Sequence, residues 1–151
     1  MKKVDTFEYV SVLKELVEEG REVSMLISGS SMSPFLCHGR DHVYFKAPDR
    51  PLRVGDMVFF QRRSGQYVLH RICKVKDGDY YIVGDAQTAI EGPVSREQIF
   101  ALVTRVQRKG RILAPGDFWW EFFARVWPHL GPLRGALSAL YGAFKRREGP
   151  P

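Results

Sequence analysis

The sequence has little of what marks secreted, disulfide-linked or membrane-spanning proteins. It contains only two cysteines, Cys37 and Cys73, in 151 residues, and such a pair cannot define a disulfide framework. No apolar run approaches the roughly 18–20 residues of a membrane-spanning helix. The first residues, Met-Lys-Lys-Val-Asp, lack the apolar segment of a signal peptide. We therefore expect the domain to stay cytoplasmic, where it is made.

Common metal and nucleic-acid motifs are also missing. Cys37, His38 and His42 are close in sequence, but an adjacent Cys-His pair followed by a four-residue step matches no common zinc spacing. We expect no metal and no other cofactor. Base-reading motifs are absent as well. The net charge of +6 therefore favours an anionic membrane surface as the partner, and we expect no binding of nucleic acid.

The remaining pattern predicts a single, mainly β domain. Apolar residues at three- and four-residue spacing over residues 5–19, ended by Gly20, predict an amphipathic N-terminal helix. Turn signals such as Ser64-Gly65, Asp77-Gly78-Asp79 and Glu91-Gly92-Pro93 separate short apolar runs, which we interpret as strands of a curved, partly closed antiparallel sheet. The predicted strands are 23–27, 42–45, 57–61, 67–75, 80–83 and 100–106.

The predicted organisation is an N-terminal helix in residues 1–22, a β-domain in residues 23–110 and a helical tail in residues 111–151. The tail is rich in aromatic and basic residues between positions 117 and 147. Tryptophan prefers the bilayer interface and basic side chains favour anionic head groups. Two interpretations stay open: the tail contacts a membrane peripherally, as an in-plane anchor at its inner face, or its aromatic residues pack on the β-domain or in a dimer interface.

Three residues carry the types needed by a serine hydrolase. Ser31 lies in a small-residue turn closed by Pro34, His70 lies within a β-prone apolar run, and Asp85 follows Gly84 at the end of a predicted strand. A serine hydroxyl needs a base within hydrogen-bond reach, and histidine suits proton transfer near neutral pH. Each residue taken alone also has an ordinary structural explanation, as a polar turn, a satisfied histidine or a turn aspartate.

Taken together, the motifs resemble the signal peptidase superfamily, which includes the self-cleaving SOS repressors. Five segments carry the resemblance in order: Gly29–Leu36, Asp41–Val43, Gly55–Phe59, Tyr67–Ile72 and Gly84-Asp85. The resemblance implies the mainly β peptidase fold and hydrolysis of peptide bonds after small side chains, in a precursor or leader peptide.

Site residues are carried over position by position. Ser31, before a methionine, corresponds to the nucleophile. The residue before Arg71 is His70, as in the endoplasmic-reticulum and archaeal type, where bacterial signal peptidases have lysine. Asp85 corresponds to the acid of the Gly-Asp motif, and neither Lys46 nor Lys74 occupies the base position.

The turn of Gly29, Ser30 and Ser31 is predicted to surround the oxyanion. Signal peptidases often have a serine at the position of Gly29, whereas the repressors have glycine there, as this sequence does. An extended peptide or precursor protein is expected to bind against two strands, with the contact residues Leu26, Ile27, Ser28, Tyr67, Val68 and Leu69. Two alternatives to a serine endopeptidase stay open: a non-catalytic peptide-binding module with the same fold, and a self-cleaving regulator.

Overall fold

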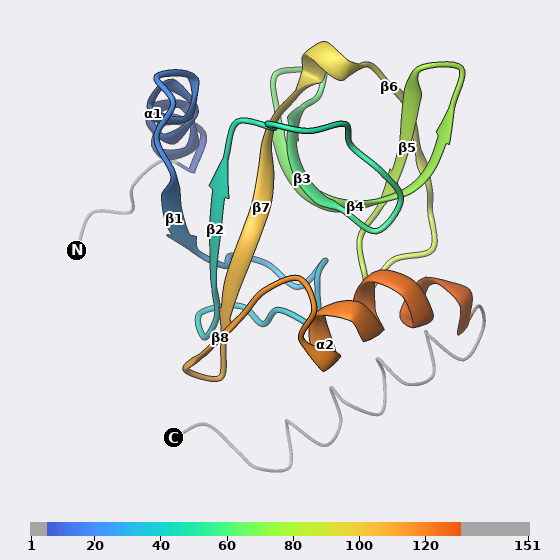
Figure 1. Ribbon diagram of the computed structural model, residues 1–151. Helices are drawn as coiled ribbons and strands as arrows, with labels where there is room; N and C mark the ends of the chain where they lie inside the picture. Colours follow the sequence, from blue (N-terminus) through green and yellow to red (C-terminus); the bar gives the residue numbers. More distant parts are fainter. Residues whose placement is uncertain (1–5, 131–151) are drawn as a thin grey trace.

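The computed structural model describes residues 6–130, arranged as one curved antiparallel sheet with a helix near each end (Figure 1). The elements are α1 (Thr6–Glu18), β1 (Val23–Leu26), β2 (His42–Lys46), β3 (Met57–Gln61), β4 (Tyr67–Lys76), β5 (Asp79–Val83), β6 (Glu91–Val94), η1 (Arg96–Gln98), β7 (Ile99–Arg108), β8 (Arg111–Leu113), α2 (Phe118–Glu121), η2 (Phe122–Val126) and η3 (Trp127–Leu130). The predicted mainly β fold with an N-terminal helix is confirmed. No helix among these residues is long and apolar enough to cross a membrane.

The sheet has the strand order β1-β2-β7-β3-β4-β5-β6, with β8 paired to β7. Every pair is antiparallel, and the sheet is not closed. Register shifts interrupt four of the pairings, at Tyr44/Phe45, Phe59/Phe60, Ile72/Lys74 and Tyr80/Ile82. Such irregularities bend strands, which explains how the ten-residue β4 curls away from the β1–β2 half of the sheet.

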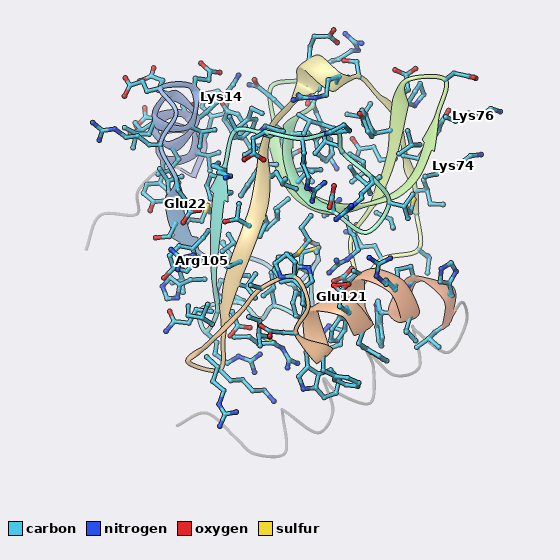
Figure 2. The ribbon with its side chains drawn as sticks, viewed as in Figure 1. Lys14, Glu22, Lys74, Lys76, Arg105 and Glu121 are labelled. Carbon is cyan, nitrogen blue, oxygen red and sulfur yellow. The ribbon has the colours of Figure 1, made fainter. Side chains whose placement is uncertain are left out.

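Side chains also tie β1 to β7 across β2 (Figure 2). Glu22, just before β1, accepts hydrogen bonds from Thr104 (3.0 Å) and from Arg105 Nη2 (3.0 Å). The Arg105 guanidinium lies 4.1 Å from the centroid of the Tyr44 ring on β2. These contacts fix the strand that leads into the predicted nucleophile turn.

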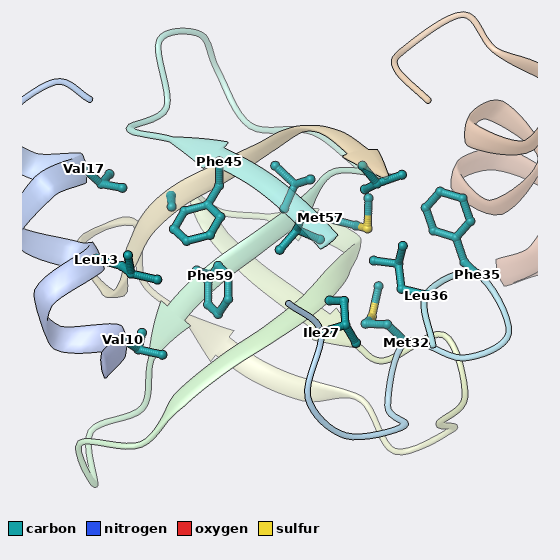
Figure 3. Close-up of a cluster of buried hydrophobic side chains, with 14 of the residues drawn as sticks. Val10, Leu13, Val17, Ile27, Met32, Phe35, Leu36, Phe45, Met57 and Phe59 are labelled. Atoms are coloured by element: carbon teal, nitrogen blue, oxygen red, sulfur yellow. The ribbon is translucent and has the colours of Figure 1, made fainter. Parts of the chain in front are cut away.

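Two hydrophobic cores occupy opposite faces of the sheet. The first joins Val10, Leu13 and Val17 of α1 to Phe59 and to the turn residue Met32 (Figure 3). The second contains Phe60, Val68 and Ile72. Successive residues of a strand point to opposite faces. Phe59 and Phe60 therefore serve different cores, which explains why β3 is apolar without alternation.

The predicted N-terminal helix is confirmed, and the turns predicted at Ser64-Gly65 and Asp77-Gly78-Asp79 join antiparallel strands as hairpins. After α1, the N–H of Gly20 (φ 90°) donates to Val17 O and that of Arg21 donates to Leu16 O, the pattern of a glycine-terminated helix. Asp77 and Gly78 both have positive φ in the β4–β5 turn, at 54° and 81°, as a tight hairpin requires.

The interpretation of Glu91-Gly92-Pro93 as a turn is wrong, because these residues form part of β6. β6 is the last strand of the sheet, and an edge strand tolerates proline because one side needs no N–H donor. The sheet also extends past residue 110, since Arg111–Leu113 form β8.

The described part of the tail has buried and exposed aromatic residues. Phe123 and Trp127 are buried in the first core, while Phe118 and Trp119 are 71% and 45% exposed. Packing on the β-domain therefore accounts for some of the aromatic residues of the tail. Residues 131–151 of the predicted helical tail lie outside the described residues.

Candidate functional site

The Ser31 turn is fixed at both ends by backbone hydrogen bonds. The Ile27 N–H donates to Asp41 O (2.8 Å) and the Gly39 N–H donates to Ile27 O (2.9 Å). Beyond Ser31, a helical turn forms through a bond from the Leu36 N–H to Met32 O (2.9 Å). Met32 and Leu36 are buried, whereas Ser31 is only half-buried. The buried neighbours therefore anchor a serine that stays accessible.

Gly29 has a φ of 88°, a left-handed conformation that glycine adopts without strain. Its N–H donates to Nδ1 of His38 (2.8 Å). That N–H therefore supports the turn and is not directed at an oxyanion, in contrast to part of the prediction. The Ser31 N–H has no acceptor among the described residues and is available for this purpose. His38 was not assigned a role from sequence, because nine positions separate it from Gly29.

His70 lies on β4 opposite Val58 of β3 and is 6% exposed. Burial lowers the pKa of His70 from 6.5 to about 4, because the imidazolium would lose its water shell. The Glu91 carboxylate opposes this change, and the nearby Arg62 adds to it. The imidazole is therefore neutral at pH 7, and its lowered pKa makes it a weaker base than an ordinary histidine.

Ser31 and His70 line the same cavity, of about 330 Å³. Among residues 6–130, no hydrogen bond joins the Ser31 hydroxyl to the imidazole. Catalytic hydrogen bonds are often long in ligand-free enzymes and tighten when substrate binds. The sequence therefore located two residues of one cavity, almost forty positions apart in the chain.

The Asp85 side chain forms an ion pair with Arg71. The two carboxylate oxygens of Asp85 accept from Arg71 Nε and Nη2, both at 2.8 Å, and both side chains are 3% exposed. Arg71 Nη1 also donates to Gly55 O (2.9 Å). No hydrogen bond joins Asp85 to His70 in the described chain, so the predicted orientation of the imidazole by Asp85 has no direct contact behind it. The reason is geometric, because a guanidinium fork binds a carboxylate through two parallel hydrogen bonds.

The segment around Asp85 instead contacts the backbone of Ser31. The Ala86 N–H donates to Ser31 O (2.9 Å), and a Cβ on Gly84 would lie 2.6 Å from the same oxygen. Trp127 Nε1 donates to Asp85 O (2.8 Å). The Arg71 ion pair and the Trp127 indole thus hold the turn after β5, which supports the serine. Sequence reasoning assigned Trp127 only to the aromatic tail and missed this contact.

A second ion pair borders the cavity. Arg62 donates from Nε and Nη2 to the two carboxylate oxygens of Glu91, both at 2.8 Å. The side chains are 34% and 33% exposed, and Arg62 lines the cavity beside Gln66. Burial raises the pKa of Glu91 less than the Arg62 hydrogen bonds lower it, so the carboxylate is ionised. Neither residue was predicted to belong to the site, because they lie 29 positions apart and Glu91 was assigned to a turn.

Five of the six predicted substrate-contact residues line the cavity, namely Ile27, Ser28, Tyr67, Val68 and Leu69. Leu26 lies next to them on β1 and is 46% exposed. Within the described sheet, β1 pairs only with β2, and residues 67–70 pair only with β3 because β5 pairing begins at Arg71. Two unpaired strand edges therefore border one cavity, a geometry that suits an extended peptide.

The weaker candidates have other contacts. The Cys37 N–H donates to Asp41 Oδ2 (2.8 Å), Cys73 Sγ donates to Tyr81 O (3.3 Å), and neither cysteine is in a disulfide. Lys46 pairs with Asp49 (2.9 Å), and Lys74 lies over the Tyr81 ring. Among the described residues, no group of His, Cys, Asp and Glu side chains could hold a metal ion.

Comparison with known proteins leaves the chain without an assigned family. No protein-family model matches it, and no curated protein matches its sequence.

Proposed function

We propose that this protein is a serine endopeptidase of signal-peptidase type that cleaves an extended precursor or leader peptide. The observation that supports the proposal most strongly is the shared cavity of Ser31 and a neutral His70 between two unpaired strand edges. The substrate adds a strand between Leu26–Ser28 and Tyr67–Leu69, so that its main chain is held by strand hydrogen bonds.

In the proposed reaction, a rotation of the side chains brings the Ser31 hydroxyl to His70. His70 takes the hydroxyl proton as Oγ attacks the scissile carbonyl, and the Ser31 N–H donates to the oxyanion. The C–N bond then breaks, and the imidazolium gives its proton to the leaving amine. A water molecule, deprotonated by His70, hydrolyses the acyl-enzyme and regenerates the serine.

Asp85 acts as a positioning residue in this proposal. Its ion pair with Arg71 fixes the segment whose Ala86 N–H binds the Ser31 carbonyl. This arrangement makes Ser31 and His70 a catalytic dyad, supported through the backbone.

A fluorophosphonate probe tests the proposal, because an activated serine attacks its phosphorus, displaces fluoride and becomes phosphonylated. We expect labelling of the wild-type protein and none of Ser31→Ala or His70→Ala. Ser33→Ala is the matched control, since it removes a hydroxyl from the same turn, and it should be labelled normally. Labelling of Ser31→Ala, or of His70→Ala at the wild-type rate, would contradict the assignment.

A peptide-binding module without catalysis is the second candidate. Two observations on residues 6–130 favour it: the Ser31 hydroxyl makes no hydrogen bond to the imidazole, and the Asp85 carboxylate is bound to Arg71. Isothermal titration with a library of extended peptides distinguishes the two: a module binds peptides without cleaving them, and Ser31→Ala leaves that affinity unchanged.

A further inference from the structure

A second cavity, of about 550 Å³, lies away from Ser31 and His70, between the β7–β8 hairpin and the C-terminal helical segment. Its lining includes Trp119, Phe122 and Phe123 together with Arg108, Lys109 and Arg111. None of the described residues that line it is acidic. The site is therefore apolar inside and positively charged along one border.

The exposed aromatic residues beside this cavity are held in place. The Trp119 ring packs edge-on against Phe118 (5.0 Å between centroids) and Phe122 (5.6 Å). The Arg108 guanidinium lies 5.6 Å from the centroid of Trp119 and donates from Nε to Phe35 O (2.7 Å). Although fixed by these contacts, Phe118 and Trp119 stay 71% and 45% exposed. Large exposed apolar side chains that gather in one place mark an interaction site.

We propose that Lys109, Arg111, Phe118 and Trp119, here called the aromatic–basic face, dock this protein on a membrane that contains anionic lipid. Tryptophan and phenylalanine insert at the level of the head groups, and each nearby lysine or arginine adds attraction to anionic lipid. Charge complementarity selects this partner, because the lining found among residues 6–130 carries three cationic side chains and no carboxylate. Nucleic acid is less suited, since the Trp119 ring is occupied by its aromatic neighbours and Arg108.

The aromatic–basic face is connected to the segment that carries Ser31. Arg108 bonds to Phe35 O and also to Pro34 O (3.3 Å), a few residues past the serine. Docking therefore brings the segment that follows Ser31, at Pro34 and Phe35, close to the lipid surface. Lipid binding itself does not depend on hydrolysis, so this proposal stands or fails separately from the proposed peptidase activity.

Flotation of the full-length protein with lipid vesicles tests the docking. Vesicles of phosphatidylcholine alone are compared with vesicles that also contain phosphatidylserine, and recovery should be high only with the anionic vesicles. Lys109→Glu/Arg111→Glu should weaken partitioning by roughly 25-fold or more, from roughly fivefold for each basic residue near the surface. Phe118→Ser/Trp119→Ser should also reduce recovery, without changing the charge.

The matched control is Lys74→Glu/Lys76→Glu, which makes the same charge change on β4. Figure 2 shows both lysines far from Glu121 on α2. This variant should float almost like the wild type, and circular dichroism melting establishes that all variants are folded. Equal recovery on neutral and anionic vesicles, no recovery on either, or equal losses in the two charge variants would overturn the proposal. Binding of labelled duplex DNA in place of vesicles, with the same dependence on Lys109 and Arg111, would overturn it as well.

Discussion

Replacing His70 by glutamine should remove much of the acid sensitivity of the folded state between pH 6.5 and pH 4. Burial lowers the pKa of His70 from 6.5 to about 4 in the folded protein, and unfolding restores the ordinary value. Between these values the unfolded state binds a proton that the folded state does not, so stability falls as the pH falls. At roughly 1.4 kcal/mol per pH unit, the wild type loses about 3 kcal/mol across this range through His70 alone.

Urea unfolding at a series of pH values measures this effect. The free energy of unfolding should fall more steeply for the wild type than for His70→Gln, with the difference approaching about 3 kcal/mol near pH 4. The buried Asp41 does not disturb the comparison. Burial acts to raise its pKa, but hydrogen bonds from Arg40, Lys109 and Cys37 lower it overall, and these contacts are the same in both proteins. The exposed His129 supplies the control, because His129→Gln removes an imidazole that is not buried. Parallel curves for wild type and His70→Gln would refute the argument and mean that water reaches the imidazole.

Two further predictions concern the support of the serine turn. Asp85→Ala leaves the Arg71 charge buried without its partner and should lower the free energy of unfolding, measured with urea, by about 3–5 kcal/mol. The control, Glu121→Ala, removes a surface ion pair and should lower it by under about 1 kcal/mol. Similar losses in the two variants would contradict the buried pairing. His38→Leu removes the acceptor of the Gly29 N–H and should slow fluorophosphonate labelling about fivefold, the value of one modest hydrogen bond, while His38→Asn, which retains an acceptor, should restore the rate. Equal slowing in the two His38 variants would exclude this hydrogen bond as the cause.

Local sequence signals predicted much of the fold. The helical spacing of α1 and the glycine after it specify the first element, and Gly65 and Gly78 mark the two hairpins. β6 was missed because Gly92-Pro93 is typical of turns, and its place at the sheet edge, where proline is tolerated, is a property of the whole sheet.

The candidate site was predictable only in part. Ser31 and His70 were identified by motif, and the folded chain brings both to one cavity. The partner of Asp85 was not predictable, since a carboxylate near a His-Arg pair can bind either residue. Adjacent strand residues point to opposite faces, and in the structure Asp85 is bound to Arg71.

The hydrogen bond between the Trp127 indole and the carbonyl of Asp85 gives this protein an intrinsic optical reporter. Indole emission responds to changes in its polar contacts, and Trp127 is buried in the first core, shielded from solvent. The loop that it binds also supports Ser31 through Ala86. If the proposed peptide binds beside Ser31, we expect the emission of Trp127 to change, which can be measured in a Ser31→Ala variant with Trp119 and Trp120 replaced by phenylalanine.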